Sequence, residues 1–211
     1  NGKVRGLALS FGKFGIAFTA KFLNQGNALV NIHLDGTIQF STGATEMGQG
    51  VNTKIQQIIA HAFGLPVKAV QAMPTSTEKN HNTSPTAASS GSDINGAAAL
   101  KACNQIKERL RIILHKHWSG EVSDGVKELE LEDCGDLSHI LFEDNMVIDS
   151  KNNNRIKFTE ALGLAYMNRV SLGGYAHFKT KGIGFDKEKS VGKPFNYFTN
   201  GAAVCEVEID E

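Results

Sequence analysis

The chain has 211 residues, 41% of them hydrophobic, and its 22 acidic residues balance its 22 lysines and arginines. This composition predicts a globular chain of one large or two small domains. The balanced charge gives no attraction to nucleic acid or to an anionic membrane, so we expect neither partner. No apolar run approaches the roughly 20 residues that cross a bilayer. The sequence does not begin with the basic and apolar segments of a signal peptide, so we expect a cytoplasmic protein.

Both ends of the sequence suggest a piece of a longer protein. The first residue is Asn1 rather than methionine, and an alternating pattern over residues 204–210 predicts a strand that still needs a partner. Cys103, Cys134 and Cys205 are too few and too widely spaced for a disulfide framework or a zinc site. We therefore expect free thiols, and no metal ion held by protein side chains.

The first half of the chain predicts strands and one helix. Residues 14–23 are rich in β-branched and aromatic residues, which suit a strand. Residues 28–34 alternate in polarity, and Asp35-Gly36 supplies a two-residue turn into a second strand at 37–40. After a glycine-rich loop at 41–50, apolar residues recur every three or four positions, which predicts a helix that ends at Gly64. Residues 67–73 predict another strand.

The second half predicts a long helix and further strands. Seven residues form one apolar helical stripe: Ile94, Ala98, Ala102, Ile106, Leu110, Ile113 and Leu114. Gly91 and Gly96 near its start should each cost roughly 0.5–1 kcal/mol, which suggests that something needs the room. Close packing against a strand is the alternative. A hairpin at 140–148, a helix from Phe158 and Thr159 to 168, and strands at 170–179 and 195–209 complete an α+β fold of mixed and antiparallel sheets packed with two main helices.

The loop at 41–50, Ser-Thr-Gly-Ala-Thr-Glu-Met-Gly-Gln-Gly, is the first candidate site. Backbone N–H groups are unpaired at the start of a helix, and glycine lets a ligand approach the backbone closely, so this loop favours an electron-rich ligand. Its spacing matches neither phosphate-binding glycine motif. An ordinary polar turn is the alternative. The second candidate is the segment at 74–93, in which hydroxyl and amide side chains dominate.

Several segments together carry a resemblance to a known family. Thr-Glu-Met-Gly-Gln-Gly at 45–50 is similar to the pyranopterin-contacting loop of the xanthine dehydrogenase and aldehyde oxidase family of molybdenum hydroxylases. Asn-Thr-Ser-Pro-Thr-Ala-Ala-Ser at 82–89 is also typical of that family, and so are segments at 14–19, 23–29, 93–96, 166–172 and 194–201. Within the family, the sequences of these motifs are most similar to those of the xanthine dehydrogenases. Residues 118–155 fall outside this agreement and are expected to form a variable surface insertion.

The resemblance implies that residues 1–211 are part of a molybdopterin-binding domain. Such an enzyme hydroxylates a purine such as xanthine or hypoxanthine, with water as the oxygen donor. FAD and 2Fe-2S clusters would lie on other domains or subunits, and the intact enzyme is expected to be an oligomer. An aldehyde or another N-heterocycle as substrate is one alternative. A non-enzymatic module that binds a nucleotide or a protein partner is another.

The resemblance also implies site residues. The expected cofactor-binding residues are Met47, Gly48, Gln49, Ala87, Ala88, Ser89, Ser90 and Gly91, and the expected substrate-binding residues are Phe18, Thr19, Ala87 and Ala88. The Gln49 amide can both donate to and accept from a pterin edge, and N–H groups at a helix start favour a phosphate. The family's catalytic glutamate and upstream substrate loop lie outside this sequence. Glu46 is therefore expected to accept hydrogen bonds from neighbouring N–H groups, and the chain alone is expected to be inactive.

Overall fold

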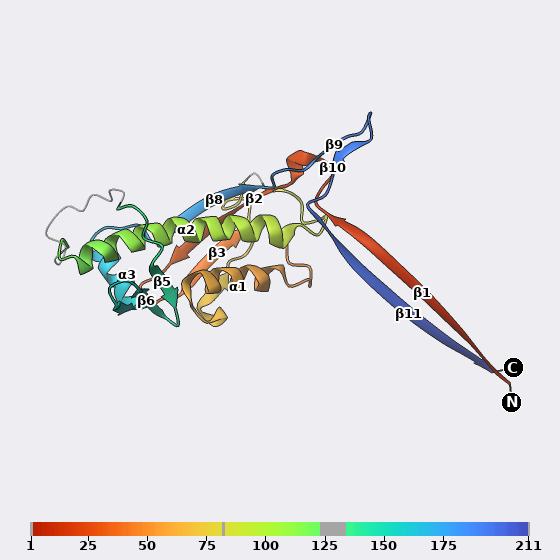
Figure 1. Cartoon of the computed structure of the whole chain (residues 1–211), viewed down its shortest axis with the longest axis horizontal. Helices are drawn as coiled ribbons and strands as arrows, with labels where there is room; N and C mark the ends of the chain where they lie inside the picture. Colours follow the sequence, from red (N-terminus) through yellow and green to blue (C-terminus); the bar gives the residue numbers. More distant parts are fainter. Residues whose placement is uncertain (1, 82, 123–133, 211) are drawn as a thin grey trace.

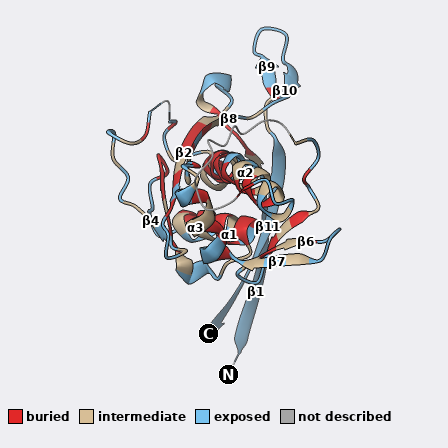
Figure 2. Ribbon diagram, turned by 90° about the vertical axis from the view of Figure 1, so that its left-hand side faces the viewer, coloured by how far each residue is buried: buried red, intermediate tan, exposed pale blue. Residues whose placement is uncertain are grey.

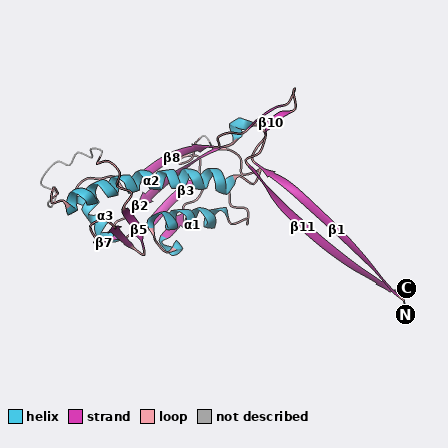
Figure 3. Cartoon of the chain, viewed as in Figure 1, coloured by secondary structure: helices cyan, strands magenta, loops and turns pink. Residues whose placement is uncertain are grey.

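The structure is a computed structural model that describes residues 2–81, 83–122 and 134–210. It consists of a body of helices and sheets, from which a long two-stranded ribbon projects (Figure 1). The helices lie together in the body, while the ribbon contains strands alone (Figure 3). None of the helices in the described part of the chain is both long and apolar enough to cross a membrane.

The ribbon pairs the two ends of the described chain. Strand β1 (Lys3–Ile16) runs antiparallel to β11 (Tyr197–Asp210), with Lys3 opposite Asp210 and Ile16 opposite Tyr197. The predicted strand at 195–209 is confirmed. The expectation that it lacks a partner in this chain is wrong, because β1 pairs with it along its whole length.

The prediction of a strand at residues 14–23 is largely wrong. Strand β1 ends at Ile16, and a 3-10 helix, η1 (Lys21–Leu23), follows it. The Asn24 side chain accepts the Phe18 N–H at 2.8 Å and donates to the Phe18 carbonyl at 2.8 Å. These bonds occupy the two backbone groups that Phe18 would need in a sheet, so the chain bends here instead of continuing as a strand.

A four-stranded mixed sheet organises the body. Its order is β4 (Val70–Ala72), β3 (Ile38–Thr42), β2 (Gln25–Ile32) and β8 (Gly173–Lys179); β3 and β4 are parallel and the other pairs antiparallel. The predicted β2–β3 hairpin is confirmed, but its turn is longer than two residues. The His33 N–H donates to the Thr37 carbonyl at 2.9 Å, so residues 34–36 close the turn. Strand β4 is shorter than predicted because a 3-10 helix, η2 (Val67–Ala69), precedes it.

The two main helices pack together beside this sheet. Helix α1 (Val51–Phe63) ends at Gly64 as predicted, with a left-handed φ of 61° at the glycine. Helix α2 (Gly91–Trp118) buries every residue of its predicted apolar stripe and packs on β2 and β8. A Cβ added to Gly96 would lie 2.6 Å from Cδ1 of Ile58. The room left by Gly96 is therefore filled by a side chain of α1, so close packing explains this glycine, but against a helix and not against a strand.

A second, three-stranded sheet contains β5 (Ile140–Glu143), β6 (Met146–Asp149) and β7 (Asn154–Lys157). The predicted hairpin at 140–148 is confirmed. Ile140, Phe142 and Val147 belong to the main core, so this part of the predicted insertion at 118–155 contributes buried side chains. Residues 123–133 of that insertion lie outside the described residues. Short strands β9 (Gly184–Asp186) and β10 (Val191–Lys193) form an exposed hairpin.

Helix α3 (Phe158–Met167) follows β7 and closes the core. Its N-cap is Lys157, not the predicted Thr159, and the Glu160 carboxylate accepts the Lys157 N–H at 3.4 Å. Buried residues gather where α1, α2 and α3 meet the sheets, while the ribbon is exposed (Figure 2). These helices and mixed sheets confirm the predicted α+β class.

Candidate functional site

The two candidate segments meet where they lead into the main helices. The glycine-rich loop joins β3 to α1, and the segment at 83–90 leads into α2. The Thr45 N–H donates to Oγ1 of Thr86 at 2.9 Å, which ties the two segments together directly. A Cβ added to Gly43 would lie 2.5 Å from Cβ of Thr83, so glycine is needed for this approach. Asn82, the first residue of the second motif, lies outside the described residues.

The two segments share a pocket of about 380 Å³. Six of the eight predicted cofactor-binding residues line it, while Gly48 and Ser90 do not. Small-molecule sites usually occupy about 300–1,000 Å³, so this volume suits a compact ligand or part of a larger one. The complete lining is Met47, Gln49, Val51, Lys54, Thr86, Ala87, Ala88, Ser89, Gly91 and Ser92.

Helix α1 already has an anion at its N-terminus. The Glu46 carboxylate accepts the N–H groups of Asn52 at 3.1 Å, Gly50 at 2.9 Å and Gly48 at 2.9 Å. These backbone hydrogen bonds, that of Asn52 first, lower the pKa of Glu46 from its ordinary value. The structural role predicted for Glu46 is therefore confirmed, and the α1 N-terminus does not need an external anion.

Helix α2 begins differently. No side chain caps its N-terminus, and the Ser90 hydroxyl instead donates to the Ala87 carbonyl at 3.3 Å. In the first helical hydrogen bond, the Ile94 N–H donates to the Ser90 carbonyl at 3.0 Å. The N–H groups before Ile94 in the helix therefore have no partner within the helix. Since Gly91 and Ser92 line the pocket, the positive end of the α2 dipole lies at its wall.

The backbone before α2 is held in an unusual conformation. Ala88 and Ser89 both have a φ of 54°, in the left-handed region that residues with a side chain seldom adopt. Two consecutive residues of this kind store strain, which is common where a backbone is shaped around a ligand. Both residues line the pocket.

Gln49 is bonded within its own loop. Its Nε2 donates to the Thr45 carbonyl at 3.0 Å, and its Oε1 accepts the Met47 N–H at 2.6 Å. The amide already uses both of its hydrogen-bonding senses, so it stiffens the loop around Met47. Pairing of this amide with a ligand would use its second N–H or a rearrangement of these two bonds.

The predicted substrate-binding residues separate into two groups. Ala87 and Ala88 line the pocket, whereas Phe18 and Thr19 do not. Lys54, a pocket residue that sequence reasoning missed, lies on α1 three positions after Val51, which also lines the pocket. Because helix residues three apart share a face, this spacing could have identified Lys54 once Val51 was placed at the start of the helix.

A larger pocket, of about 740 Å³, lies at the opposite end of α1. His61, Lys107, Arg111 and Phe142 are among its lining residues, and none of the predicted site residues is. Volume alone would favour this pocket, but it contains neither candidate motif. Within the described ranges, no group of three or more His, Cys, Asp and Glu residues is arranged to hold a metal ion.

Known proteins resemble this chain over almost its whole length. Residues 1–211 match the family described as "Molybdopterin cofactor-binding domain". The xanthine dehydrogenase of Dictyostelium discoideum is 40% identical over 211 residues, which are 99% of this chain and 13% of that protein. Xanthine dehydrogenase 1 of Arabidopsis thaliana is 38% identical over 208 residues, again 99% of this chain and 13% of that protein. The chain thus spans about an eighth of the length of these relatives.

Solved structures share the fold. Quinoline 2-oxidoreductase from Pseudomonas putida 86 superposes with a TM-score of 0.71 at 22% identity, covering 99% of this chain and 25% of that one. The reconstituted CO dehydrogenase from Oligotropha carboxidovorans superposes with a TM-score of 0.68 at 18% identity, covering 99% of this chain and 24% of that one. The similarity to xanthine dehydrogenases and the family match confirm the resemblance found in the motifs. The chain belongs to the molybdopterin cofactor-binding domain family.

Proposed function

We propose that the pocket between residues 43–50 and 83–92 holds the molybdopterin cofactor of a molybdenum hydroxylase. One observation carries this proposal: the two motifs typical of such enzymes lie 41 residues apart at Thr45 and Thr86, yet form the two walls of one pocket. Because the relatives are about eight times longer than this chain, the remaining domains of the enzyme would supply the catalytic glutamate, the FAD and the 2Fe-2S clusters.

The residues fit the two ends of such a cofactor. The phosphate would be held by Ser89, Gly91 and Ser92 at the uncapped start of α2, with the ammonium of Lys54 adding a positive charge. The Glu46 carboxylate already accepts N–H groups at the α1 N-terminus, whereas the Asp93 carboxylate in the first turn of α2 accepts the Tyr197 hydroxyl. The N–H groups at the start of α2 therefore favour this helix as the phosphate end. The pterin ring would then lie toward Met47 and Gln49.

This chain positions the cofactor and leaves room for the substrate. When bound, the cofactor supplies the redox chemistry of substrate hydroxylation. The Gly48 N–H is bonded to Glu46, and Gly48 does not line the pocket, so it contributes through the φ of 96° that lets the loop turn at this position. The small side chains of Ala87 and Ala88 keep space open beside the pterin. Phe18 and Thr19 remain proposed substrate contacts, on a surface outside this pocket.

Filling the pocket tests cofactor binding. We expect Ala87→Leu in the full-length enzyme to reduce the molybdenum and pterin recovered per polypeptide, because the larger side chain occupies the cavity. Ala87→Gly is the matched control, since it leaves the cavity open and should keep its cofactor. Normal molybdenum and pterin content in Ala87→Leu would show that the cofactor binds elsewhere.

We further propose xanthine or hypoxanthine as the substrate, with urate as product and a role in purine catabolism. The support is the 38–40% identity to proteins named xanthine dehydrogenase. A panel of xanthine, hypoxanthine, an aromatic aldehyde and quinoline, assayed with the full-length enzyme, tests this. Faster turnover of the aldehyde or of quinoline would reject a purine substrate and leave the cofactor proposal intact.

A further inference from the structure

The β1–β11 ribbon exposes far more apolar surface than a free two-stranded ribbon should. Val4 is 50% exposed, Val207 52% and Ile209 59%, and almost every other ribbon residue is also exposed. The ribbon projects away from the body, so no other described element covers it (Figure 1). An isolated pair of strands is marginally stable in water, and large exposed apolar patches usually mark an interaction site.

The register divides the ribbon into two unlike faces. Side chains alternate along a strand, and directly opposed residues share a face. The face that contains Val4 opposite Ile209, Val207 opposite Gly6, and Cys205 opposite Ala8 carries no charged residue from end to end. All six charged residues of the ribbon lie on the other face: Lys3, Arg5, Lys13, Glu206, Glu208 and Asp210.

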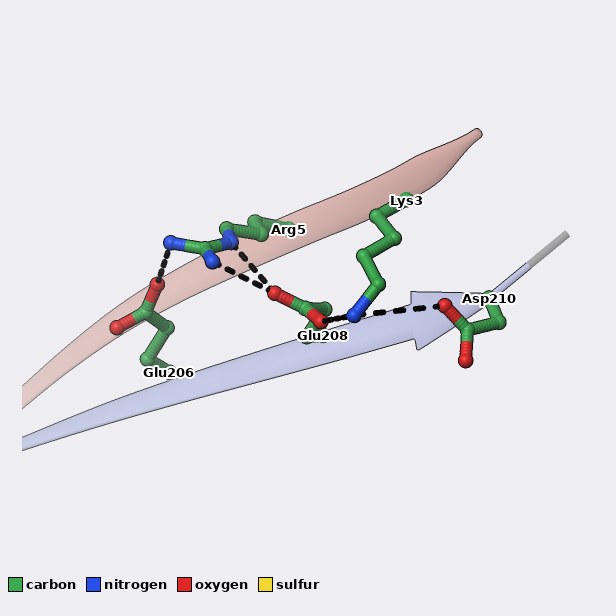
Figure 4. A network of polar contacts seen from close by, with 5 residues as sticks. All are labelled: Lys3, Arg5, Glu206, Glu208 and Asp210. Carbon is green, nitrogen blue, oxygen red and sulfur yellow. Dashed lines mark hydrogen bonds and ion pairs between the residues drawn. The ribbon is translucent and has the colours of Figure 1, made fainter. Parts of the chain in front are cut away.

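The charges at the outer end of the ribbon satisfy one another. Arg5 bonds the Glu208 carboxylate through Nη2 at 2.7 Å and through Nε at 2.8 Å, and it reaches Glu206 at 3.4 Å (Figure 4). Lys3 pairs with Glu208 and lies 3.8 Å from Asp210. This end of the charged face is thus paired within the ribbon and suited to water, whereas the uncharged face carries no ionic group at either end. The inner part of the charged face also holds apolar residues, Leu9, Phe11 and Val204.

The matched relatives contain further polypeptide beyond the residues that correspond to this chain. Solved structures match 99% of this chain, the ribbon included, within polypeptides of which the match is about a quarter. The xanthine dehydrogenase relatives place the same residues in chains about eight times as long. We propose that the uncharged face of the ribbon packs against another domain of the same polypeptide, while the ion-paired outer end of the opposite face remains in water. This inference rests on family membership and not on the cofactor proposal.

Thiol reactivity in the full-length enzyme tests the proposal. Cys205 lies on the uncharged face and is exposed in the isolated chain, whereas its neighbour Glu206 points to the charged face. We expect Cys205 of the native enzyme to react with a maleimide at least about tenfold more slowly than the thiol at position 206 of a Cys205→Ser/Glu206→Cys variant, since a packed face must open before it reacts. Mass spectrometry of the labelled peptides measures both rates. Equal rates would overturn the proposal.

Photo-crosslinking identifies the covering surface. Phe14 also lies on the uncharged face, so Phe14→benzoylphenylalanine should crosslink to a peptide of the same polypeptide outside residues 1–211. The comparison replacement at the ion-paired outer end of the charged face is Leu7→benzoylphenylalanine, opposite Glu206, which should not crosslink to that peptide. A crosslink from position 14 that joins two polypeptides, or that joins the enzyme to another protein, would overturn the proposal. Cofactor content plays no part in either readout.

Discussion

The hydrogen bond between Thr45 and Thr86 offers the sharpest test of the proposed site. It joins the two pocket walls at 2.9 Å, with Thr45 exposed and Thr86 half-buried. Replacement Thr86→Val keeps the shape of the side chain but removes the acceptor. A hydrogen bond of this kind contributes a net of about 1 kcal/mol, which corresponds to about fivefold in an equilibrium constant. We therefore expect the cofactor to dissociate about fivefold more readily from the Thr86→Val enzyme.

Loss of molybdenum and pterin from purified full-length enzyme, followed over time during dialysis, measures this effect. Thr86→Ser is the matched control, because it retains the hydroxyl and loses only a methyl group. The serine variant should release cofactor within about twofold of the wild-type rate, since its hydrogen bond persists. If the valine variant releases cofactor no faster than the serine variant, the reasoning that the two walls are coupled through this bond is wrong.

Three further predictions concern the rest of the chain. The folded state lowers the pKa of Glu46 below its ordinary 4.5. The stability that Glu46 adds is therefore complete above pH 4.5 and is lost as the pH falls through the lowered pKa. Melting temperatures of the wild type and of Glu46→Gln should differ at neutral pH and converge in acid. Gly64→Ala should destabilise the chain by about 1–3 kcal/mol in urea unfolding, because the φ of Gly64 is +61° and the new Cβ would lie 2.5 Å from Cα of Glu143. The control Gly163→Ala, in open space within α3, should stabilise the chain by about 0.5–1 kcal/mol. Equal effects of the two substitutions would contradict this prediction. The isolated 211-residue chain should form no urate from xanthine even when molybdopterin is supplied, and urate at an ordinary rate would refute the absence of catalytic residues.

Local chemistry explains the elements that were predicted correctly. The stripe on α2, the left-handed Gly64 at the end of α1 and the β5–β6 turn with Asp144 and Asn145 at positive φ each depend on residues close together in sequence. Periodicity and turn propensity report on such short-range arrangements. The errors occurred where one specific side-chain hydrogen bond or a distant partner strand decides. One polar side chain, Asn24, ended the strand expected at 14–23, and β11 found its partner almost two hundred residues away.

The sequence by itself determined the α+β class, the two main helices and the two motifs that identify the family, because these are written in periodicity and in contiguous residues. Only the tertiary structure decided that the motifs share a pocket, that Lys54 joins them there, and that Phe18 and Thr19 lie outside it. It also decided which helix start is open: Glu46 closes that of α1, while Ser90 turns its hydroxyl to Ala87 and leaves α2 uncapped. These features depend on how separate segments approach in space, and that approach is set by packing of the whole core rather than by any one stretch of residues.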